Sequence, residues 1–219
     1  MTLITDSVSN NYQSLEVILA AEMCGQMDEM KVKVLDAKQM NSKENKARDP
    51  NSGKAIVPAM EMPNGKVLTE GSAIAKLILQ KAGAKGTPFL GQNAFEQASV
   101  SQFVSKAVHS LHFPFKAVST AIFTGKGADK AHKELPTIKS VCEEFESHLE
   151  GRKFLAGASL SQADLAVFAG MVGPMQTVLD AGFRTTVPKL DKWFDTMCEE
   201  AVVVKHCGHI KKCEVSMLL

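Results

Sequence analysis

Two short segments in the first half of the chain limit most strongly how it can fold. Residues 56–60 read Ile-Val-Pro-Ala-Met and residues 70–74 read Glu-Gly-Ser-Ala-Ile, with the hairpin signal Pro-Asn-Gly at 63–65 between them. Because proline donates no ladder hydrogen bond, Pro58 is expected at the first residue or the edge of a strand. If the bond before it is cis, the adjacent peptide groups turn outward and can pair with an extended peptide. The second segment opens a helix whose first N–H groups suit a carboxylate, so the two segments predict a site for a peptide backbone and its acid group.

The first part of the chain mixes strand and helix patterns. Strand patterns cover residues 2–5, 30–35, 57–61 and 66–68, and helical patterns cover 12–23 and 71–81. Residues 36–54 are polar and predict a loop with at most one helical turn. The order strand–helix–strand, loop, strand–strand–helix predicts a thioredoxin-like domain over residues 1–82. Residues 83–91 have the Gly- and Pro-containing composition of a linker.

Residues 92–219 predict an all-helical C-terminal domain, so that the whole chain is of the α/β plus all-α class. Helices are expected near 92–122, 134–149, 161–180, 188–198 and 199–206. Pro114 is expected to kink or end the first of these helices. Gly125-Lys126-Gly127 lacks the features of a phosphate-binding loop and predicts a turn.

Ser161-Gln162-Ala163-Asp164 has the pattern of a helix capping box, with Asp in the position usually held by Glu. The helix that follows is apolar on nearly every face, which is typical of a buried central helix. A buried helix end depends on its cap because water is absent. We therefore interpret Ser161 and Asp164 as a structural cap rather than as a catalytic acid and its partner.

Composition excludes several classes of function. The chain has 219 residues, a net charge of +1 and no basic block, so direct nucleic-acid binding is not expected. Its apolar runs are too short for a membrane span, and its N-terminus has no secretory signal. The five cysteines are scattered, which predicts reduced thiols in a cytoplasmic protein. The cysteines and histidines near the C-terminus have irregular spacing, so no metal site is expected.

The motifs together resemble the glutathione transferase superfamily. They are Val-Pro-Ala at 57–59, Leu-Thr-Glu-Gly-Ser-Ala-Ile at 68–74, Phe-Leu-Ala-Gly at 154–157 and Ser-Gln-Ala-Asp at 161–164. Within that superfamily the chain is most similar to the N-terminal, transferase-like region of the elongation factor 1-gamma subfamily. The segments that carry this finer similarity are residues 2–5, 18–25, 183–194 and 208–214.

The resemblance implies a glutathione-binding site on the first domain. Val57 and Pro58 would pair with the cysteinyl backbone, and the Glu70 turn would hold the γ-glutamyl group. Two positions depart from the family pattern. Gly71 stands where the hydroxyl usually lies, with Ser72 one position later, and Ile56 stands where Lys or Gln usually reaches the glycyl carboxylate, with Lys54 two positions earlier.

The resemblance also implies a hydroxyl that lowers the pKa of the glutathione thiol, because the thiolate is the nucleophile. The candidates are Ser7, Ser9 and Tyr12. The alternative is structural: Ser9 or Asn10 caps the first helix, and Tyr12 packs against it.

Two functions from different classes follow from the resemblance. In the first, the chain is a scaffold module of the translation elongation factor 1 complex that binds the nucleotide-exchange subunits, with weak or vestigial glutathione binding. In the second, it is an active glutathione transferase that conjugates glutathione to electrophiles. A third role is docking within an aminoacyl-tRNA synthetase complex, and a homodimer is common for such folds. Because full elongation factor 1-gamma carries a further domain, the chain is expected to be a fragment, a truncated form or a free-standing relative.

Overall fold

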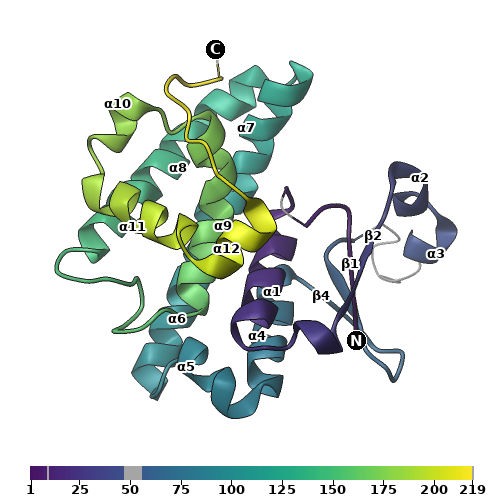
Figure 1. Ribbon diagram of the computed structural model, residues 1–219. Helices are drawn as coiled ribbons and strands as arrows, with labels where there is room; N and C mark the ends of the chain where they lie inside the picture. Colours follow the sequence, from purple (N-terminus) through teal and green to yellow (C-terminus); the bar gives the residue numbers. More distant parts are fainter. Residues whose placement is uncertain (9, 47–55, 219) are drawn as a thin grey trace. The chain divides into compact units, whose positions relative to one another are not determined.

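The computed structural model describes residues 1–8, 10–46 and 56–218, and these divide into two compact units, Met1–Leu90 and Gly91–Leu219 (Figure 1). The two units are described separately below. Among the described residues, no helix combines the length and the apolar composition that crossing a membrane requires.

The first unit contains a mixed sheet of four strands in the order β2-β1-β3-β4. The strands are β1 (Thr2–Thr5), β2 (Lys31–Val34), β3 (Ala59–Glu61) and β4 (Val67–Thr69). β1 runs parallel to β2 and antiparallel to β3, and β3 pairs antiparallel with β4. Leu3 and Ile4 of β1 are completely buried, as expected for an inner strand. This arrangement confirms the predicted thioredoxin-like fold.

Two helices, α1 (Tyr12–Met23) and α4 (Gly71–Lys81), pack against each other in this unit. Their bounds are those that the helical pattern predicts. The segment expected to be a loop contains two short helices, α2 (Ala37–Met40) and α3 (Lys43–Lys46), rather than one turn. The remaining pieces are the 3₁₀ turns η1 (Met27–Glu29) and η2 (Gly83–Lys85) and the short helix α5 (Thr87–Leu90), so most of the composition-based linker is helical.

In the second unit, the described residues form only helices as regular structure. They are α6 (Ala94–Lys106), the π-helical segment η3 (Ala107–His112), α7 (Phe113–Thr124), α8 (Ala128–His148), α9 (Gln162–Thr177), α10 (Ala181–Arg184), α11 (Pro188–Cys198) and α12 (Ala201–Cys207). Helix α9 contacts α6, η3 and α7 (Figure 1). Nearly all its residues are buried, which confirms the expectation of a central helix.

Two prolines in this unit behave differently. The long helix predicted over 92–122 is interrupted by η3, where the Phe113 N–H donates to the Val108 carbonyl. Pro114 follows in the first turn of α7, where a missing N–H costs little. The prediction that a helix begins at 134 was wrong, because α8 begins at Ala128 and keeps Pro136 inside it.

The segment after α12 is extended and fixed to the helices. The Cys213 N–H donates to the Met175 carbonyl at 2.8 Å, and the Met217 N–H donates to the Thr177 carbonyl at 2.7 Å. Buried Arg184 donates to the carbonyls of Leu179 and Cys213, both at 2.6 Å. These bonds anchor the C-terminal segment to the ends of α9 and α10.

Candidate functional site

The first part of the candidate site is the start of β3. The Val57–Pro58 peptide bond is cis, and Pro58 is buried directly before the strand. The strand itself begins at Ala59, two residues later than the pattern predicts, and Ala59 pairs with Ile4 and Thr69. Ile56 and Val57 are half-buried. The cis bond thus lies where the chain enters an inner strand of the sheet.

The second part is the turn that begins α4. Glu70 is exposed and has a φ of 68°, in the left-handed region that non-glycine residues seldom adopt. Gly71 after it is buried against α1. A Cβ atom added at Gly71 would lie 2.6 Å from the Gln13 Cβ and 2.7 Å from the Gln13 carbonyl oxygen. Because one of these atoms belongs to the backbone, a serine fits here only if α1 moves.

The hydroxyl one position later is already engaged. Ser72 donates from its Oγ to Glu16 Oε2 at 2.8 Å, and Glu16 lies on α1 with 0% of its surface exposed. A buried carboxylate needs such partners, because an unsatisfied charge is costly. Ser72 therefore links α4 to α1, and its hydroxyl does not replace the one missing at Gly71.

The third part is the approach to α1. The Ser7 Oγ accepts from the Asn10 N–H at 3.1 Å, and the Ser7 N–H donates to Thr5 Oγ1 at 3.2 Å. The cap of α1 is Asn11, whose Oδ1 accepts from the Ser14 N–H at 3.0 Å. The structural alternative, with Ser9 or Asn10 as the cap, was therefore wrong about the capping residue.

Tyr12 opens α1 and is half-buried. Burial raises the pKa of its hydroxyl, and the negative charge of Glu70 raises it further. Tyr12 therefore stays protonated and can act as a hydrogen-bond donor but not as a base. The structure brings Tyr12 into the electrostatic range of Glu70, although these residues are far apart in the sequence. Two further candidates, Ser9 and Lys54, lie outside the described residues.

In the second unit, Ser161 and Asp164 form a capping box at the start of α9. The Asp164 carboxylate accepts from the Ser161 N–H at 3.0 Å and from the Ser161 hydroxyl at 2.9 Å. It also accepts from the Leu155 N–H at 2.9 Å and from Trp193 Nε1 at 3.3 Å. Burial raises the pKa of Asp164, and these four hydrogen bonds act in the opposite direction. Asp164 thus ties the loop before α9 and helix α11 to the helix start.

The sequence did not predict that Leu155 and Trp193 are hydrogen-bond partners of Asp164. The capping-box pattern is local and contains only Ser161 and Asp164. Leu155 belongs to the 154–157 motif, which offered a signal, but Trp193 lies 29 residues away along the chain.

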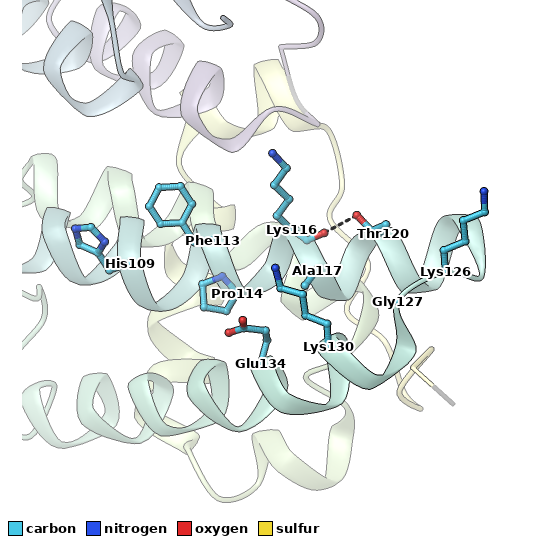
Figure 2. Close-up of a pocket in the computed structure, with 10 residues that line it drawn as sticks. All are labelled: His109, Phe113, Pro114, Lys116, Ala117, Thr120, Lys126, Gly127, Lys130 and Glu134. Carbon is cyan, nitrogen blue, oxygen red and sulfur yellow. Dashed lines mark hydrogen bonds between the residues drawn. The ribbon is translucent and has the colours of Figure 1, made fainter. Parts of the chain in front are cut away.

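A pocket of about 600 Å³ lies between α7 and α8 of the second unit (Figure 2). Its wall on α7 includes Phe113 and Pro114, and Phe113 is 54% exposed. Lys116, Lys130 and Glu134 also line it, so the pocket joins an apolar wall to charges of both signs. Sequence reasoning found the turn at 125–127 beside this pocket but not the pocket itself.

No group of three or more His, Cys, Asp or Glu residues within residues 1–8, 10–46 and 56–218 is placed to hold a metal ion. The resemblance implies that Val57, Pro58 and Glu70 of the first unit would hold glutathione. The structure fits this ligand only in part, because Gly71 offers no hydroxyl and has no room for one.

Comparison with known proteins agrees with this geometry. Residues 101–201 match the family model described as "Glutathione S-transferase, C-terminal domain". The GST-like domain of elongation factor 1-gamma from Saccharomyces cerevisiae superposes with a TM-score of 0.81 at 19% identity, covering 99% of this chain and 96% of that one. The chain is therefore a glutathione transferase-like protein in its fold, as the resemblance predicts.

Two of the relatives carry different names. A Fusarium protein named "Glutathione S-transferase-like protein LUC7" is 30% identical over 143 residues, which is 63% of this chain and 64% of that protein. Elongation factor 1-gamma of Carassius auratus is 29% identical over 163 residues, which is 72% of this chain and 35% of that protein. The matches thus span less than two thirds of the first relative and about a third of the second. Similarity to the elongation factor 1-gamma subfamily is confirmed, and the chain also resembles transferase-like proteins.

Proposed function

We propose that the chain is a transferase-like scaffold module of the translation elongation factor 1 complex, which binds the nucleotide-exchange subunits in the cytoplasm and holds glutathione weakly or not at all. The observation that carries this proposal is made at Gly71, where a protein hydroxyl usually holds the γ-glutamyl group of glutathione. Helix α1 leaves no room for a side chain at this position. Similarity to elongation factor 1-gamma supports the translation role. The division into residues 1–82, a linker at 83–91 and residues 92–219 is part of the same proposal.

The magnitude of the expected loss in affinity follows from the missing contact. A hydrogen bond to a charged group contributes roughly 1.5–3 kcal/mol. Its absence therefore weakens glutathione binding by about 10- to 100-fold, because 1.4 kcal/mol corresponds to a factor of ten. Ser72 does not compensate, since its hydroxyl is bonded to buried Glu16.

Thiol activation by the described candidates would depend on a hydrogen bond from a hydroxyl. The Ser7 hydroxyl supports the backbone before α1, and the raised pKa of Tyr12 keeps it protonated. Either hydroxyl can donate a hydrogen bond to a thiolate, which is the contact that the resemblance implies for activation, so these two candidates do not by themselves decide between scaffold and enzyme.

Exposed aromatic side chains on the second unit support a role in protein contacts. Phe95 on α6 is 83% exposed, and Phe113 and Phe123 on α7 are 54% and 71% exposed. A contiguous exposed apolar patch can mark a partner-binding site, whereas single exposed apolar side chains are common on protein surfaces, so these phenylalanines are candidate contacts for the variants below to test. A second copy of the chain, or proteins of a synthetase complex, are the other partners that this surface can serve.

The alternative function is an active glutathione transferase. It is favoured by the cis Val57–Pro58 bond and by Glu70, which keep the backbone part of the glutathione site. The Fusarium relative carries a transferase-like name, which supports the same reading. Under this alternative, the chain holds glutathione through the backbone and Glu70 alone.

Three measurements separate these functions. Calorimetric titration with glutathione and an aryl chloride conjugation assay test the enzyme, and gel filtration with purified exchange subunits tests the scaffold. The scaffold proposal predicts a stable complex that Phe113→Ala or Phe123→Ala weakens, with negligible conjugation. Phe154→Ala, at a half-buried position in the loop before α9, is the comparison variant. Conjugation at the rate of ordinary transferases, without a complex, would reject the scaffold.

A further inference from the structure

A second pocket of the helical unit, here called the basic pocket, lies between the loop after α8 and the first turns of α11. Its volume is about 450 Å³, within the range of small-ligand sites. Arg152 and Lys153 line it from the loop, and Lys189 and Lys192 line it from α11. Its lining residues include no carboxylate. Four exposed cationic side chains therefore line one cavity.

Most of this positive charge is not offset by nearby acids. Lys189 forms ion pairs with Glu150 and, at 3.6 Å, with Glu146. Arg152, Lys153 and Lys192 make no ion pair with any residue that the structure describes. Lys153 lies 5.1 Å from the centre of the Phe154 ring, a contact that leaves its charge in place. The basic pocket thus carries about three uncompensated positive charges.

The acidic residues of α11 are engaged elsewhere. Asp191 Oδ1 lies 2.9 Å from Lys212 Nζ and 3.5 Å from Arg184 Nε. Asp195 Oδ1 lies 2.7 Å from Lys212 Nζ. Asp191 therefore binds the C-terminal segment and α10, and Asp195 binds the C-terminal segment, so both carboxylates are engaged away from the basic pocket. The separation of charges along α11 leaves one side of the helix positive.

The floor of the basic pocket is apolar. Leu149 and Trp193 both line it and both are buried. An arginine presents a planar fork of N–H donors that matches phosphate oxygens, and lysines act as adjustable point charges. A single carboxylate would leave most of these cations without a partner, whereas a chain of phosphate groups would engage several.

We propose that the basic pocket binds a small ligand that carries a diphosphate or longer polyphosphate group. Arg152 and Lys192 are the main contacts, from the loop and from α11. Lys153 extends the positive surface at the rim, and Lys189 is held in place by its two glutamates. This site lies within the second unit and does not depend on the proposed scaffold function.

The test uses Trp193, the only tryptophan of the chain, as a reporter at the site. Inorganic pyrophosphate is titrated into the full chain while tryptophan fluorescence is recorded, with calorimetry in parallel. We expect saturable binding that weakens when the salt concentration rises from about 50 to 200 mM, because screening acts on exposed charges. Arg152→Gln and Lys192→Gln should each weaken binding by about fivefold or more, since each removes a charge-assisted contact.

Lys133→Gln is the matched control. Lys133 is exposed on α8 and does not line the basic pocket, so this variant makes the same change in net charge and should bind within about twofold of the parent. The absence of saturable binding by both methods would overturn the proposal. Equal weakening by Lys133→Gln and by the pocket variants would also overturn it, because binding would then reflect net charge alone.

A second arm identifies the source of the phosphate. Adenosine diphosphate binding at least tenfold more tightly than pyrophosphate would show that the pocket takes a nucleotide. Equal affinities would show that it takes the polyphosphate group itself. Adenosine diphosphate binding that Arg152→Gln and Lys192→Gln leave unchanged would place the nucleotide elsewhere and count against this site.

Discussion

His112 should make the stability of the helical unit depend on pH. It lies in the π-helical segment η3, is 1% exposed, and has its ring against Gly170 of α9, where an added Cβ would lie 2.6 Å from the imidazole. Burial lowers the pKa of His112 to about 3, although the backbone at Ala166 opposes part of this shift. The native unit therefore keeps His112 neutral over the whole mildly acidic range.

The sign follows from proton binding. The unfolded chain protonates His112 below its ordinary pKa of 6.5, whereas the folded chain does not do so until about 3. The unfolded state thus binds more protons in this window, and stability falls as the pH drops through it. Between pH 7 and pH 5 the expected loss is about 2 kcal/mol. The loss should continue toward pH 3, where the folded state also begins to bind the proton.

The assay is urea unfolding at pH 7, 6 and 5, followed by the fluorescence of Trp193, which lies in the same unit. His112→Gln removes the titrating group. Between pH 7 and pH 5, the free energy of unfolding of this variant should therefore fall by about 2 kcal/mol less than that of the parent. Asp164 titrates in both proteins, so its effect cancels in the difference. His109→Gln, at an exposed histidine of the same segment, should keep the parental pH dependence. Identical pH dependence in the parent and His112→Gln would refute the assignment of a buried neutral imidazole.

Three further predictions concern the caps, the C-terminal segment and the α1–α4 contact. Asp164→Ala should lower the free energy of unfolding by about 2–4 kcal/mol, because it leaves several buried donors unpaired, whereas Asp180→Ala at the cap of α10 should cost about 1 kcal/mol; equal losses in urea unfolding would contradict the role of Asp164. Arg184→Gln should release the C-terminal segment, so limited proteolysis should cut within residues 208–218 faster than in the parent, and an unchanged cleavage rate would argue against the anchor. Gly71→Ser should destabilise the first unit by about 1–3 kcal/mol through overpacking against Gln13, as measured by thermal unfolding. An unchanged or higher midpoint would show that α1 moves to accommodate the serine without loss of stability.

The sequence predicted the first unit well where one periodic pattern covered a whole element. The bounds of α1 and α4 follow directly from their helical spacing, and the order of strands and helices along the chain predicted the thioredoxin-like domain. The prediction failed at element bounds that lie next to irregular structure or contain a proline. Strand β3 begins only after the cis Val57–Pro58 bond, and α8 accepts Pro136 because tertiary packing outweighs the local cost of one lost hydrogen bond.

The candidate site was predicted only in part because its contacts join distant residues. The absence of a hydroxyl at Gly71 is visible in the sequence, but the reason, the approach of Gln13, is visible only in three dimensions. The bond from Ser72 to Glu16 spans 56 positions along the chain. The basic pocket was not predicted from the sequence for the same reason, because Arg152 and Lys192 come from separate elements.

The most direct test of the central claim is the affinity of the chain for glutathione, measured by calorimetry on the parent and on Gly71→Ser. Closure of the hydroxyl position by α1 predicts that the parent binds glutathione about 10- to 100-fold more weakly than an ordinary glutathione transferase measured in parallel, with no gain from the serine. A Kd equal to that of the ordinary transferase, or a roughly tenfold improvement in Gly71→Ser without loss of stability, would contradict the claim that α1 occupies this position.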